Sequence, residues 1–132
     1  MGILRYTASA DNTISNAFRE DLIYRGTDAN MGASDILEVF GIYGQASTGS
    51  AEMSRVLIKF DHAGMALDRS NGLLPNSGSV NFILKLYDAE HYGPTPKNYD
   101  LVVQRVTKAW EEGYGLDMEE YTDVLSGSLS KG

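Results

Sequence analysis

The chain has 132 residues, of which 42% are hydrophobic and 22% charged, a balance that fits neither a disordered segment nor a membrane protein. Its formal net charge is −7 and its Lys and Arg residues are scattered singly, which argues against nucleic acid as a partner, because a phosphate backbone requires clustered positive charge. The absence of cysteine excludes disulfides and thiolate metal sites.

A chain of this length is expected to form one domain, which we place at residues 1–125, followed by a flexible or partner-docked tail at residues 126–132. Residues 1–7 are strand-like and lack the apolar run of a secretory signal. We therefore expect a protein that is made and kept without signal-peptide export. No apolar stretch reaches the length that spans a membrane.

Short apolar runs separated by Gly, Asn, Ser and Asp predict strands joined by turns. Six strands are expected, at residues 3–9, 13–18, 36–43, 54–60, 80–87 and 99–107. Since no helical pattern separates them, the sequence favours an all-β, antiparallel β-sandwich over a parallel α/β sheet.

The clearest strand pattern lies at residues 80–87, where Val80, Phe82, Leu84 and Leu86 alternate with Asn81 and Lys85. Long connections are expected at residues 45–53, 61–79 and 89–98. Loops of this kind usually carry binding specificity.

A hydrolytic triad has little support in this sequence. Without cysteine its base would be His62 or His91, and both lie in expected loops with no nucleophile elbow nearby. We therefore expect solvated or hydrogen-bonded loop histidines and no enzyme activity.

The densest acidic segment lies at residues 111–123. Calcium prefers carboxylate and carbonyl oxygen ligands, and four acidic residues of this segment form a candidate calcium site: Asp117, Glu119, Glu120 and Asp123. Their spacing does not match an EF-hand loop. The alternative is a solvated acidic loop or a short helical turn after Trp110.

Tyrosines near strand ends and loops form a second candidate site. Tyr43, Tyr87, Tyr92 and Tyr114 could stack on sugar rings, since a tyrosine offers both an apolar face and a hydroxyl group. Tyrosine is also common in strands and at protein interfaces. We take Tyr43, Tyr92 and Tyr114 as candidate interface or glycan contacts, and Trp110 as a core or corner anchor.

Several of these segments resemble the DNRLRE-type domain family. They are Arg55-Val56-Leu57-Ile58-Lys59-Phe60-Asp61, the preceding Asn30-Met31-Gly32, the strand at Leu84, the corner Trp110-Glu111-Glu112-Gly113, and the opening run at residues 6–14. The resemblance covers residues 6–124. It implies a jelly-roll-like β-sandwich, a fold found in surface, extracellular and phage structural proteins and similar to carbohydrate-binding modules. Residues 110–123 look most like versions in tailed-phage virion proteins.

Family members usually continue past the Trp-Glu-Glu-Gly corner into further strands and a second tryptophan segment, whereas this chain ends at Gly132. We expect either a sandwich of fewer strands or, preferably, an open edge covered by another subunit.

The resemblance thus implies a virion protein that is synthesised in the host cytoplasm and decorates a capsid. Its expected partners are the major capsid protein or other virion subunits and further copies of itself, taken as a trimer. A carbohydrate-binding or tail-fibre adhesion module is the alternative.

Overall fold

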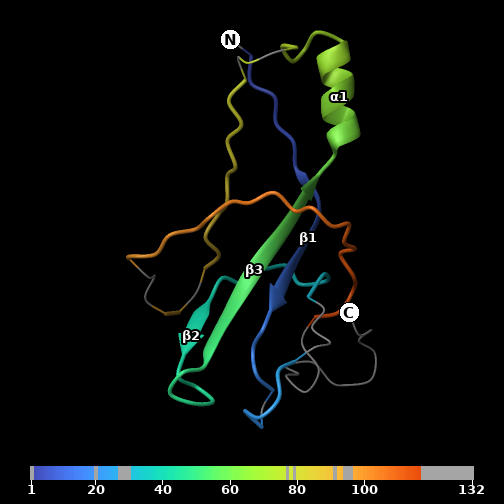
Figure 1. The fold of residues 1–132 in the computed structure, drawn as a ribbon. Helices are drawn as coiled ribbons and strands as arrows, with labels where there is room; N and C mark the ends of the chain where they lie inside the picture. The colour runs from blue at the N-terminus through green and yellow to red at the C-terminus, as the bar shows by residue number, and fades with distance from the viewer. Residues whose placement is uncertain are drawn as a thin grey trace. The chain divides into compact units, whose positions relative to one another are not determined.

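The computed structural model describes residues 2–19, 21–26, 31–76, 78, 80–90, 92–93 and 97–116. The chain divides into two compact units, which we describe separately: unit 1 is Met1–Phe60 with Trp110–Gly132, and unit 2 is Asp61–Ala109. Regular structure in the described residues is mostly strand, with a three-stranded antiparallel sheet in unit 1 and one helix in unit 2 (Figure 1). A β-rich chain is therefore confirmed, whereas one domain over residues 1–125 stays a prediction.

The sheet of unit 1 has the strand order β1-β3-β2. Its central strand is β3 (Ala51–Phe60), which pairs antiparallel with β1 (Ala8–Ser15) on one side and β2 (Gly41–Tyr43) on the other (Figure 1). The register aligns Thr13 with Val56 and Ile42 with Glu52. The β-branched residues within β3 favour this extended conformation.

Three expected strands change their bounds in the structure. The runs expected at 3–9 and 13–18 meet in β1, which spans the polar residues between them, and the strand expected at 54–60 begins earlier, at Ala51. Of the run expected at 36–43, only Gly41–Tyr43 joins the sheet. These differences arise because pairing with β3, rather than local apolar content, decides where a strand begins and ends.

The buried residues of unit 1 are mainly polar. Thr13 is completely buried and Glu52 is 2% exposed, and Asn12 and Ser50 are buried as well. Among the described residues Met31 is the only buried hydrophobic one. The Thr13 Oγ1 atom accepts a hydrogen bond from the N–H of Glu38 at 3.0 Å. Specific polar contacts therefore tie loops to the sheet where apolar burial is small.

The turn between β2 and β3 is shorter than the loop expected at residues 45–53, because residues 51–53 belong to β3. Buried Ser50 organises this turn: its Oγ atom accepts hydrogen bonds from the N–H groups of Ala46 and Ser47. The same hydroxyl group donates to the carbonyl of Ser47 at 2.9 Å. The Ser50 side chain thus adds to the backbone hydrogen bonds of this turn, which join the N–H of Gly44 to the carbonyl of Ser50 and the N–H of Ser50 to the carbonyl of Ser47.

Unit 2 contains the helix α1 (His62–Ser70), where a loop at residues 61–79 was expected, so this prediction is wrong. Asp61 is the N-cap: its Oδ1 atom accepts hydrogen bonds from the N–H groups of Ala63 and Gly64. At the other end Gly72 has a φ of 76°. The N–H of Gly72 donates to the carbonyl of Arg69, and that of Leu73 donates to the carbonyl of Asp68. This pair of bonds is a Schellman motif.

The strands expected at residues 80–87 and 99–107 do not form in this structure. Neither segment pairs in a sheet within the part of the chain that the structure describes, and both run as coil (Figure 1). An alternating sequence favours a strand, but a strand also needs a neighbour for its backbone hydrogen bonds. The described part of unit 2 provides no such neighbour for either segment.

Candidate interaction surface

The corner Trp110-Glu111-Glu112-Gly113 lies against β1 in unit 1. The N–H of Asp11 donates to Oε1 of Glu112 at 2.8 Å, and Nδ2 of Asn12 donates to the carbonyl of Glu112 at 2.6 Å. Nearby, the N–H of Ala33 donates to the carbonyl of Gly115 at 3.0 Å. Two of the segments that suggested the family resemblance, the corner and the opening run at residues 6–14, are therefore in contact, and their contacts serve the structure of unit 1.

A second cluster surrounds the buried carboxyl group of Glu52. Its Oε2 atom accepts a hydrogen bond from the N–H of Phe18 at 2.8 Å, while Oε1 has no hydrogen-bond partner among the described residues. The Arg25 guanidinium group lies 4.1 Å from the centre of the Phe18 ring and donates to the carbonyls of Asn16 and Ala51. These contacts fasten residues 16–25 to the start of β3.

The three tyrosines proposed as contacts are all exposed. Tyr43 ends β2 and is 78% exposed. Tyr114 lies two residues after Glu112, which contacts β1, and is 74% exposed. Tyr92 is fully exposed and belongs to unit 2. Each of the three aromatic side chains is thus accessible in its own unit.

The proposed calcium ligands Asp117, Glu119, Glu120 and Asp123 lie outside the described residues, as do His91 and the tail at 126–132. His62, expected in a loop, is the first residue of α1 and is exposed. Within the described ranges, no group of three or more His, Asp or Glu side chains could hold a metal ion. None of the helices described there is both long and apolar enough to cross a bilayer.

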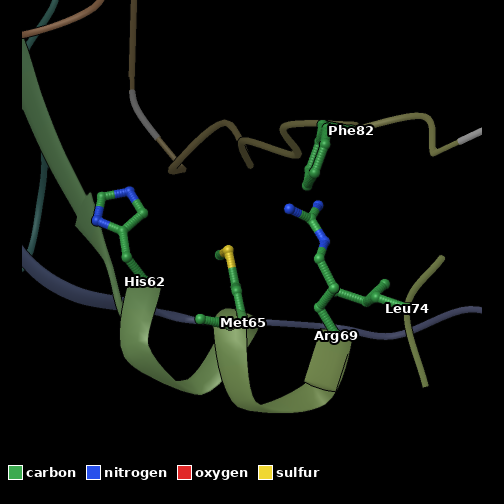
Figure 2. A pocket seen from close by; sticks show the side chains of 6 residues that line it. His62, Met65, Arg69, Leu74 and Phe82 are labelled. Carbon is green, nitrogen blue, oxygen red and sulfur yellow. The ribbon is translucent and has the colours of Figure 1, made fainter. Parts of the chain in front are cut away.

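A shallow pocket of about 190 Å³ lies beside α1 in unit 2. The helix contributes His62, Met65, Ala66 and Arg69, and Leu74 and Phe82 complete the lining. Figure 2 shows the Arg69 guanidinium group and the Phe82 ring pointing toward each other across it. Its volume is below the range of about 300–1,000 Å³ that is usual for small-molecule sites, so an apolar side chain of a partner fits it better than a cofactor.

The most extensive feature of unit 2 is apolar. Large hydrophobic side chains of residues 80–87 and 99–106 stand exposed rather than packed in a core. They are Phe82, Ile83, Leu84, Leu86, Tyr87, Tyr99, Leu101, Val102, Val103 and Val106, which we call the unit 2 apolar segments. The sequence predicted a strand in each segment and a core-facing side for residues 80–87, because periodicity does not show which surface covers a face.

Charge is divided unequally between the two units. Unit 2 has five Lys and Arg against five Asp and Glu, whereas unit 1 has six against thirteen and thus carries the whole net charge of −7. An acidic surface repels copies of itself, and a neutral apolar one does not. Unit 2 is therefore the part of this chain best suited to close contact with another protein.

Comparison of the chain with protein-family models, with curated proteins and with solved structures finds nothing that matches it. The resemblance to the DNRLRE-type family accordingly depends on the sequence motifs alone.

Proposed function

We propose that this protein is a non-enzymatic structural component of a phage virion, a decoration protein that binds across neighbouring capsid subunits. The observation that supports it most is the exposure of the unit 2 apolar segments. Large apolar patches on a folded protein mark sites of protein contact. In this proposal the strands missing from a jelly-roll-like β-sandwich form when the protein meets its partners.

In this proposal the protein stabilises the capsid by covering apolar surface, without a chemical reaction. Apolar surface gains roughly 25 cal/mol for each Å² removed from water, so a protein that covers the boundary between two capsid subunits adds this free energy to their association. Separation of the subunits then requires exposure of the covered surface. Tyr43 at the end of β2 and Tyr92 in unit 2 are exposed aromatic residues of the kind enriched at such interfaces.

The test is binding of purified protein to undecorated particles, measured as copies per particle. Tyr43→Ala and Tyr92→Ala should each lower occupancy without changing the circular dichroism spectrum. Tyr24→Ala is the matched control, because Tyr24 is also exposed but lies in the turn between Phe18 and Arg25. Occupancy that is equal for all three variants and the parent protein would contradict these contacts.

A carbohydrate-binding or tail-fibre adhesion module is the second candidate, and the exposed rings of Tyr43, Tyr92 and Tyr114 favour it. It predicts saturable binding of a sugar by the isolated protein, with a change in tyrosine fluorescence. A glycan array with no response, together with particle binding, would favour the decoration protein.

A further inference from the structure

Two segments of unit 2 combine exposed apolar side chains with an unpaired backbone. In residues 80–87 and 99–106 the ten large apolar residues expose between 43% and 90% of their surface. Neither segment pairs in a sheet within the described ranges. Their sequences are nonetheless typical of strands, since both are rich in β-branched and aromatic residues. A segment with strand-forming sequence and no sheet partner can pair with a strand of another chain.

The exposed area is sufficient for a stable interface. An aromatic side chain buries about 150–250 Å² and an aliphatic one somewhat less, so these ten residues expose on the order of 1,000 Å² in each copy. A standard protein interface buries about 800 Å² on each partner. The two segments could supply that area without any contribution from unit 1.

The charge of unit 2 is compatible with a second copy of the same unit as the partner. Its five basic and five acidic residues cancel, so two copies of this unit can approach without net repulsion. The segments themselves carry few charges: Lys85 in the first, and Asp100 and Arg105 in the second. These two segments therefore offer a strongly charged partner little complementary charge.

We propose that residues 80–87 and 99–106 form β-strands by pairing with the same segments of a second copy. Each copy then supplies the backbone donors and acceptors that the other lacks, as in other cases of strand addition between chains. Because the same surface is used on both sides, residues of one segment meet their counterparts across a symmetric interface. This pairing requires no particle, and so it goes beyond the proposed function.

Hydrogen exchange and light scattering over a range of concentrations test the inference. At high concentration the mass should be a multiple of the monomer mass, and the amides of both segments should exchange slowly. On dilution the mass should fall to that of one chain, and the same amides should lose their protection. The amides of β3, which pair within the chain, should stay protected throughout.

Substitutions that introduce a charge show whether the unit 2 apolar segments form the interface between copies. Ile83→Asp and Val103→Asp each place a carboxylate among the unit 2 apolar segments, and each should raise the concentration for half-association by about tenfold or more. Ile3→Asp is the matched control, because Ile3 is 82% exposed and Ile83 79%, but Ile3 lies in unit 1. It should leave association unchanged.

Two results would overturn the inference. One is a monomer at every concentration whose segment amides are protected, since the strands would then pair within one chain. The other is a monomer whose segments are never protected. A parent protein that stays monomeric at every concentration but still binds particles would refute strand pairing between copies and leave the decoration function intact.

Discussion

The carbonyl group of Glu112 lies so close to the α-carbon of Gly32 that no side chain can be accommodated at position 32. A methyl group there would overlap with the Glu112 carbonyl and lie 2.8 Å from the carbonyl oxygen of Gly113. The same Glu112 accepts hydrogen bonds from Asp11 and Asn12 of β1. Gly32 therefore allows three distant stretches of unit 1 to meet.

Gly32→Ala should destabilise unit 1 by about 1–3 kcal/mol, because the added methyl group meets rigid backbone rather than a side chain that can move. Urea unfolding, followed by circular dichroism, measures the change. Gly41→Ala is the control: nothing lies within 4 Å of the added methyl group, so stability should be unchanged or rise by about 0.4–1 kcal/mol. Equal effects of both substitutions would show that the contact with Glu112 has no energetic importance.

Glu52→Ala should cost about 1–3 kcal/mol, since it leaves the N–H of Phe18 without its buried acceptor. Glu52→Gln keeps an oxygen in nearly the same position and should cost less. Urea midpoints of the two variants give the comparison. A Gln variant as unstable as the Ala variant would indicate that the carboxylate itself, rather than the bond to Phe18, is required.

Thr13→Val preserves the shape of a completely buried side chain but removes the acceptor for the N–H of Glu38. We expect a loss of about 1 kcal/mol or somewhat more. In a hydrogen-exchange experiment the Glu38 amide should lose protection while those of β3 keep theirs. Thr7→Val, at an exposed position just before β1, should change neither quantity.

Asp61→Ala should fray the first turn of α1, at a cost of about 0.5–2 kcal/mol, because the N–H groups of Ala63 and Gly64 lose their acceptor. Exchange rates of these two amides report the effect directly. Asp61→Asn retains a capping oxygen and should behave almost as the parent protein. Rates that are unchanged in the Ala variant would mean that the N-cap does not hold this turn.

How far the sequence predicts the fold differs from one element to the next. Alternating apolar residues located most of β3, whereas β1 was predicted as the ends of two separate strands, at residues 3–9 and 13–18. The helix α1 was missed, although its boundary signals are present in the sequence: Asp61 as N-cap and Gly72 after the last turn. The helix was missed because it is short and its apolar stripe is weak. Cap residues would have been a better guide here than periodicity.

The candidate contact residues, like the fold, were predicted only in part. Exposure at strand ends and loops was expected for Tyr43, Tyr92 and Tyr114, and all three are exposed. That the segment of Tyr114 contacts β1 could not be foreseen, because Glu112 and its partners Asp11 and Asn12 are far apart in the chain. The pocket beside α1 was also missed, since it joins the helix to Phe82, a residue assigned in advance to a strand.

By itself, the sequence determined the β-rich character of the chain, the acidic charge and the position of its longest strand, because each follows from residue types that are close together along the chain. Only the tertiary structure decided that Glu112 meets Gly32 and β1, and that residues 80–87 and 99–106 pair with no strand in the described part of the chain. Local sequence sets the preference of a segment for an extended backbone. Its hydrogen-bond partner is chosen by segments far away in the chain, or by another chain.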